Sequence, residues 1–209
     1  MRRINAKYCL GLAALCFAVS FTGCISIPTS PTPRYYALTP MNENKAVVAD
    51  SMSARLNAMI IGIGPVKIPE YLNRPQIVTM NNEKMLQFAQ FDRWGESLDL
   101  GLARLIREDL TSILPGTKLT LYPWNPLVTV KYQVAVEIIQ LDSDLAKDMH
   151  FVVQWTVIDV QNSKTVIIKR SEFRLPIVSH NYSGLAQTLS TACSSLSDQI
   201  AQALASLRK

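Results

Sequence analysis

Two long segments of the chain carry apolar residues at three- and four-residue spacing, a pattern typical of helices that bury one side. The first begins at Trp94 and Gly95 and covers residues 95–113, and the second covers residues 182–207. Pro115 comes shortly after the first segment and predicts its end. We therefore expect two amphipathic helices, each packed against a sheet.

Runs of alternating apolar residues fill most of the remaining chain and predict strands. The last three runs follow one another through short turns, which indicates an antiparallel meander. The alternation changes phase near Ile138, which predicts a β-bulge there. The expected strands are residues 34–38, 56–66, 76–80, 84–91, 118–122, 131–141, 149–160 and 165–173.

The order of these elements predicts the fold class. Two helices are separated by strands, and three strands lie in succession between them. This arrangement favours an α+β, two-layer fold with a mixed, mostly antiparallel sheet and both long helices packed on one face.

The first 23 residues have the layout of a secretory signal peptide. A basic head of three cations precedes an uncharged apolar run over residues 8–21, which is shorter than the roughly 20 residues that a spanning helix needs. The run leads into Gly23 and Cys24, and this ending resembles a lipobox. The resemblance implies cleavage between Gly23 and Cys24 and acylation of the Cys24 thiol. An ordinary signal peptide and an uncleaved anchor are the alternatives.

Cleavage after Gly23 would release a mature chain that consists of a tether and one domain. Residues 24–33 hold the acylated Cys24, three prolines and no charge, which predicts a semi-extended tether. Residues 34–209 suffice for one buried core and are short for two. Ile25 stands where an Asp retains an enterobacterial lipoprotein in the inner membrane, so the sorting rule implies the periplasmic face of the outer membrane.

Composition narrows the classes of function. The formal charge of +5 falls to +2 without the signal segment, which holds three cations and no acid, so charge gives little support to nucleic-acid binding. Besides Cys24, the mature chain retains only Cys193, which excludes an intramolecular disulfide. The fold must therefore rely on its apolar core.

The residues that usually carry catalysis or bind metals are poorly arranged for either. His150 and His180 have no partner at metal-ligand spacing, and the sequence contains no Gly-x-Ser-x-Gly motif. The acidic segment 142–148 lacks the EF-hand spacing, which favours a solvated hairpin tip over a calcium site. We expect no enzymatic activity, no metal, and no cofactor beyond the covalent lipid on Cys24.

Two proline-bounded segments are candidates for contact with a partner. Pro69 and Pro75 enclose Tyr71 and Arg74, an aromatic and basic pair that no core requires. Trp124 lies between two further prolines in a stiff loop, where its indole is either buried or presented to a partner. Tyr71, Arg74 and Trp124 are therefore the candidate docking residues.

The sequence also contains a series of short motifs, which follow one another along the mature chain. They are Tyr35-Tyr36-Ala37-Leu38, residues 62–78, Trp94-Gly95-Glu96-Ser97-Leu98 and Tyr122-Pro123-Trp124. The most specific is Pro-x-Tyr-Leu-x-Arg-Pro-Gln at residues 69–76. Together they resemble the ABC-type transport auxiliary lipoprotein family, that of paraquat-inducible protein C.

This resemblance implies a lipoprotein that works with a membrane-anchored MCE-domain protein and its inner-membrane partner to move lipid between two membranes. The chain would dock the outer end of an MCE tube through Tyr71, Arg74 and Trp124 and so support envelope integrity. The family serves ATPase-linked and ATPase-independent MCE systems, and a ring-forming partner leaves homo-oligomerisation open. The competing hypotheses are a lipid carrier with an apolar groove between sheet and helices, and an enzyme of unrecognised type.

Overall fold

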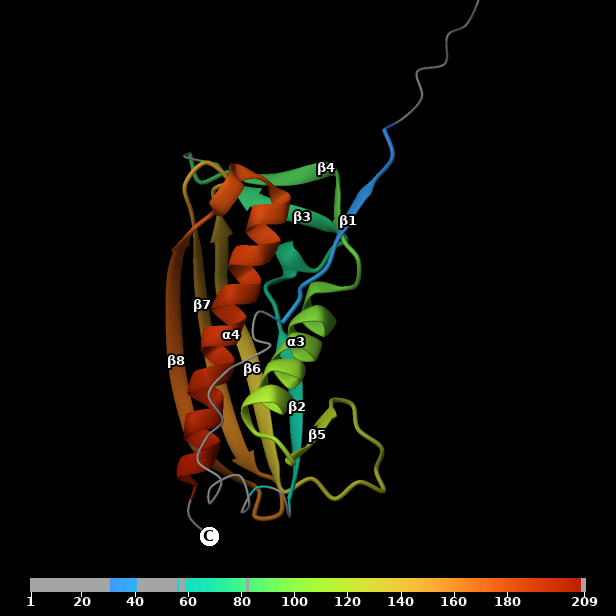
Figure 1. Cartoon of the computed structure of the whole chain (residues 1–209), viewed down its shortest axis with the longest axis vertical. Coiled ribbons are helices and arrows are strands. Elements are labelled where there is room, and N and C mark those ends of the chain that lie inside the picture. Colours follow the sequence, from blue (N-terminus) through green and yellow to red (C-terminus); the bar gives the residue numbers. More distant parts are fainter. Residues whose placement is uncertain (1–30, 41–55, 57–58, 82, 208–209) are drawn as a thin grey trace, which may run out of the picture. The chain divides into compact units, whose positions relative to one another are not determined.

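The computed structural model describes residues 31–40, 56, 59–81 and 83–207. The lipobox, with Gly23 and Cys24, and most of the tether lie outside these residues. The long helices within these residues are α3 (Leu98–Ile113) and α4 (Tyr182–Ser206), and the short 3-10 helices η1 (Glu70–Leu72) and η2 (Val178–His180) accompany them (Figure 1). The described strands are β1 (Arg34–Tyr36), β2 (Ile60–Lys67), β3 (Gln76–Met80), β4 (Leu86–Trp94), β5 (Lys118–Leu121), β6 (Tyr132–Ser143), β7 (Asp148–Asp159) and β8 (Lys164–Pro176).

The larger sheet has the strand order β5-β2-β6-β7-β8. Strand β2 runs parallel to both β5 and β6, whereas β6, β7 and β8 pair antiparallel through short turns. The predicted meander is therefore confirmed. Both helices cover the same face of this sheet, which confirms the α+β fold class (Figure 1).

The predicted bulge lies in β6. The register of β6 against β7 shifts between Ile138 and Gln140, which leaves Ile139 as the extra residue. Ile139 is 43% exposed, while Ile138 and Leu141 on either side are buried. The bulge thus returns Leu141 to the core-facing side, although the simple alternation placed it on the opposite face.

A second, smaller sheet has the order β1-β4-β3, whereas the sequence analysis assumed a single sheet. Its register explains the separation. Val78 pairs with Phe88, but Gln76, two residues earlier, pairs with Arg93, so β4 contains extra residues and bends. The first part of β4 pairs with β3, and its last three residues pair parallel with β1. The β3–β4 hairpin lies across one end of the layers formed by the larger sheet and the helices (Figure 1).

Helix α3 begins later than expected. Trp94 was expected to open the helix, but it is the last residue of β4 and is buried in the core. Ser97 is the N-cap, and the helix starts at Leu98. A tryptophan followed by a glycine is compatible with a buried strand end and with a helix start. The sequence pattern therefore could not distinguish these two structures.

The interface between helices and sheet is filled by apolar side chains. Members with no exposed surface are Phe151, Trp155, Leu105, Leu110, Leu189, Leu196 and Ile200. Trp155 also donates its indole N–H to Ser171 Oγ at 3.0 Å, which satisfies its polar atom inside the core. Cys193 is equally buried, and this burial raises the pKa of its thiol. It is therefore a small core residue.

Candidate functional site

Tyr71 is less exposed than the sequence suggested. It lies in η1, is partly buried and packs against the core. Its hydroxyl contacts the backbone of Leu141, and burial raises the pKa of Tyr71. The premise that no core requires this aromatic residue was wrong, because the fold places β6 beneath it.

Arg74 is exposed as expected, and it has an aromatic partner that the sequence analysis missed. Its guanidinium carbon lies 4.2 Å from the centre of the Phe88 ring, a cation–π contact. Phe88, Leu86 and Met85 are 48%, 37% and 54% exposed and come from the β3–β4 hairpin. We call Arg74, Lys84, Met85, Leu86 and Phe88 the hairpin surface. The run of apolar residues at 85–88 was visible in the sequence, but which of its members face solvent depends on the register with β3.

Trp124 lies in the loop that follows β5, and it is neither fully buried nor fully exposed. Its indole rests on Gly62 of β2, where a Cβ would overlap the ring. The Tyr122 ring meets it edge-on, with centroids 5.5 Å apart and planes at 84°. Tyr122 is 48% exposed and Leu127, further along the loop, is 91% exposed. We call Tyr122, Trp124 and Leu127 the aromatic loop.

The loop is held by backbone contacts at both ends. The Tyr122 N–H donates to the Ile63 carbonyl at 2.9 Å, and the Lys131 N–H donates to the Ile60 carbonyl at 2.9 Å. Inside the loop, Asn125 Oδ1 accepts from the Leu127 N–H at 2.9 Å. The exposed aromatic and apolar side chains are thus carried on a loop fixed to β2.

The hairpin surface and the aromatic loop lie at opposite ends of β6. The aromatic loop leads into the start of β6 at Tyr132, whereas Tyr71 contacts Leu141 near its end. A strand of this length spans roughly 35 Å. The three candidate docking residues therefore do not form one surface: Tyr71 and Arg74 lie at one end, and Trp124 lies at the other.

A polar hollow of about 310 Å³ lies between the β3–β4 hairpin and the β6–β7 turn. Two ion pairs lie in its lining, with Arg174 Nη1 at 3.2 Å from Asp148 Oδ2 and Lys147 Nζ at 3.8 Å from Asp144 Oδ2. Across the part of the chain that the structure describes, no group of three His, Cys, Asp or Glu side chains could hold a metal ion. The acidic segment 142–148 lies at this solvated hairpin turn.

Comparison with known proteins assigns the family. Residues 36–201 match the family of the ABC-type transport auxiliary lipoprotein component. The chain belongs to this family. Comparison with curated proteins found no match.

Solved structures share the fold of this auxiliary lipoprotein. The crystal structure of an uncharacterised protein superposes with a TM-score of 0.66 at 17% identity and covers 83% of this chain and 99% of its own. Protein XCC0632 from Xanthomonas campestris superposes with a TM-score of 0.60 at 13% identity and covers 82% of this chain and 95% of its own. At these identities the similarity establishes the fold alone.

Strand β1 is held in the domain by a buried carboxylate. Arg34 donates through Nε and Nη2 to the two oxygens of Asp92, each at 2.8 Å, and the Tyr36 hydroxyl donates to Asp92 at 2.7 Å. Asp92 is buried, and its hydrogen bond from Arg34 lowers its pKa. Burial, followed by the hydrogen bond to Asp92, raises the pKa of Tyr36.

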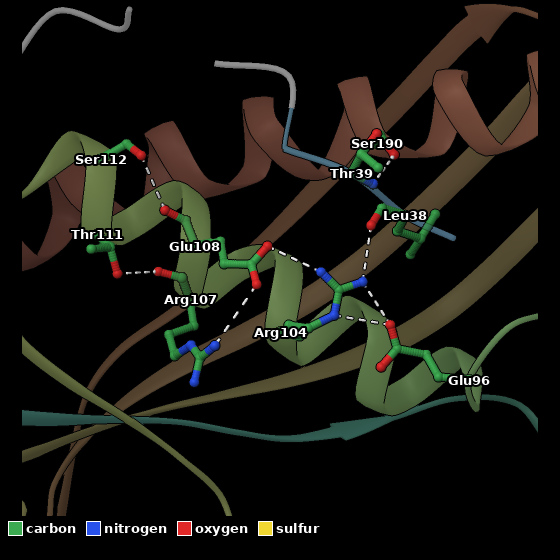
Figure 2. A network of polar contacts seen from close by, with 9 residues as sticks. All are labelled: Leu38, Thr39, Glu96, Arg104, Arg107, Glu108, Thr111, Ser112 and Ser190. Atoms are coloured by element: carbon green, nitrogen blue, oxygen red, sulfur yellow. Dashed lines mark hydrogen bonds and ion pairs between the residues drawn. The ribbon is translucent and has the colours of Figure 1, made fainter. Parts of the chain in front are cut away.

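A second polar network fixes the residues after β1 to the helices (Figure 2). Arg104 of α3 donates to the Leu38 carbonyl at 2.9 Å and to Glu96 at 2.6 Å, and the hydrogen bond to Glu96 raises the pKa of Arg104. The Thr39 N–H donates to Ser190 Oγ of α4 at 3.2 Å. The described helices include none that is both long and apolar enough to cross a membrane.

Proposed function

We propose that this lipoprotein is anchored to the periplasmic face of the outer membrane through acylated Cys24 and serves an MCE-type system that moves lipid between the two membranes. Its role is to hold the outer end of an MCE tube and so to support envelope integrity. Membership of the transport auxiliary family over residues 36–201 and the lipobox at Gly23 and Cys24 support this proposal. The role is one of attachment, without catalysis.

The observation that carries the docking role is the aromatic loop. Tryptophan and tyrosine are the residues that most often dominate the binding energy of protein interfaces. Here both rings lie on a loop fixed to β2, beside a leucine that is 91% exposed. A preorganised surface of this kind loses little entropy when a partner binds. Tyr71 and Arg74 lie too far away to contact the same part of a partner, so Trp124 is the docking residue in this proposal.

The carrier hypothesis requires an apolar groove between the sheet and the helices. In the described residues this interface is packed with fully buried side chains, among them Trp155 and Leu196. An acyl chain would have to displace them. Docking is therefore the better supported function.

The test is a pull-down of the full lipoprotein from detergent-solubilised envelopes, with mass spectrometry of protein and lipid in the eluate. We expect wild type to retain an MCE-domain protein and Leu127→Glu to lose it. Leu100→Glu is the matched control, because Leu100 is 55% exposed on α3 outside both surfaces and its substitution should leave the partner bound.

Each result bears on a separate part of the proposal. An eluate of wild type without any MCE-domain protein would contradict the function itself. Full retention by Leu127→Glu would contradict only the assignment of the aromatic loop. Stoichiometric phospholipid would restore the carrier hypothesis, and the mass of the purified particle in detergent would report whether the lipoprotein forms a homo-oligomer.

A further inference from the structure

We propose that the hairpin surface lies on the bilayer that holds the lipid anchor, so that the domain contacts the membrane directly as well as through its tether. This inference rests on the proposed anchor at Cys24, but not on the identity of the transport partner. It concerns the end of the domain opposite the aromatic loop.

The chemistry of the hairpin surface fits a phospholipid interface. Three apolar side chains, Met85, Leu86 and Phe88, are between 37% and 54% exposed within four consecutive positions. Arg74 lies over the Phe88 ring, and Lys84 precedes Met85 at the hairpin turn. Apolar side chains that enter the headgroup region beside cations that pair with anionic headgroups are the usual composition of peripheral membrane contacts.

The apolar side chains of the hairpin surface stay partly exposed beside a strand that is buried. Val78, which pairs with Phe88 across the hairpin, is buried, as are Ile77 and Thr79 on the same strand. Directly paired residues point to the same face of a sheet, so Phe88 lies on the same face as the buried Val78 and yet remains 48% exposed near the hairpin tip. A hairpin tip that served only as a turn would be stable with polar residues at these positions.

The described chain enters the domain near this surface. Strand β1 pairs with the end of β4, and the Tyr36 ring lies 6.3 Å from the Tyr182 ring at the start of α4. Helix α4 starts just after β8, whose last residue, Pro176, pairs with Asp148 beside the polar hollow. The chain therefore enters the domain at the end where the β3–β4 hairpin lies (Figure 1).

The length of the tether agrees with this placement. Cys24 precedes Arg34 by ten residues, which can span at most about 35 Å when extended. Arg34 pairs with Asp92, and β4 runs from there back to Leu86 over roughly 20 Å. The anchor can therefore reach the bilayer while the hairpin surface touches it. In that orientation the aromatic loop points away from the membrane, toward a partner that approaches from the periplasm.

Acidic side chains lie at the hairpin turn and beside it. Glu83 lies at the hairpin turn, exposed, next to Lys84. At the hairpin surface itself Arg74 and Lys84 outnumber Glu83, while Lys84 also faces the polar hollow that Asp142 and Asp148 line. The apolar side chains make the contact specific to a bilayer rather than to anions in general.

A dye placed on the hairpin tests the inference in the full lipoprotein. Met85→Cys provides one thiol that can be labelled, because Cys24 carries the lipid and Cys193 has no exposed surface. The labelled protein is inserted into vesicles of three parts phosphatidylethanolamine and one part phosphatidylglycerol, with and without a nitroxide quencher on the acyl chains. We expect a blue shift of the dye emission and loss of more than half of its intensity to the quencher.

Two variants make the result specific. The same dye on Leu127→Cys, in the aromatic loop, should show neither shift nor quenching. The second variant adds Phe88→Glu and Leu86→Glu to the labelled Met85→Cys protein. Its dye emission should approach that of the Leu127→Cys protein, and the protein should still float with the vesicles.

Every other outcome overturns the inference. An unshifted dye at position 85 on protein that floats with the vesicles would leave the anchor and the docking role intact and remove the membrane contact. A shift that occurs only after an MCE-domain partner is added would make the hairpin surface a protein interface. A chain that does not float carries no anchor, and both this inference and the proposed localisation would then be wrong.

Discussion

Substitution of Gly62 by alanine should displace the Trp124 indole from its seat on β2. A Cβ at position 62 would overlap the ring, and β2 is held in the sheet on both sides, so the loop has to move. A tryptophan buries about 150–250 Å² when fully enclosed. Losing half of this contact at about 25 cal/mol per Å² corresponds to ~2–3 kcal/mol of unfolding free energy, as an upper value.

Fluorescence reports this displacement directly. The chain contains three tryptophans, and Trp94 and Trp155 are buried. A red shift of the emission and easier quenching by acrylamide in Gly62→Ala would therefore arise from Trp124. Urea unfolding of the same protein measures the accompanying loss of stability.

Gly101→Ala is the matched control. A Cβ there would lie 3.4 Å from Glu96, a flexible side chain, so the helix can accept it. Alanine is also favoured over glycine inside a helix by about 1 kcal/mol, and the control should be as stable as wild type or more so. If Gly62→Ala kept both the emission maximum and the unfolding midpoint of wild type, the indole would not rest on Gly62 and the docking surface would be less ordered than we infer.

Two further predictions concern the buried polar groups. Since hydrogen bonds lower the pKa of Asp92 below its ordinary 3.8, the carboxylate stabilises the fold above about pH 4, and this contribution disappears as the pH falls through the lowered value. Asp92→Asn should therefore unfold more easily than wild type at neutral pH, and thermal melts should show the difference shrinking in acid; a constant difference would contradict the role of its charge. Ser171→Ala leaves the buried Trp155 N–H without its acceptor and should cost about 1–3 kcal/mol in urea unfolding. Ser171→Thr keeps the hydroxyl and should cost less, and equal losses would point to packing instead.

The sequence predicted features that depend on local periodicity. The stripe of apolar residues defined α4, and the alternation with its change of phase at Ile138 predicted both the meander and the bulge. These patterns persist over many residues and arise because one side of each element faces the core. They can therefore be predicted from a single sequence.

Features that depend on pairing between distant segments were not predicted. The third strand of the smaller sheet, β1, pairs with Asp92–Trp94, and nothing near either segment indicates this partner. The same applies to the candidate site. The burial of Tyr71 depends on Leu141, and the separation of Arg74 from Trp124 depends on the order of the strands. Residue types suggested contact with partners, but only the fold showed that they form two surfaces.

The attachment of β1 determines how the domain would carry load. A pull on the chain before Arg34 would enter the domain through β1, whose three residues pair with β4 and whose Arg34 and Tyr36 side chains both bind Asp92. A force directed along the strand would shear these bonds together instead of peeling them apart one by one. Under the function proposed above, such a displacement of the bilayer would move the whole domain before β1 is released.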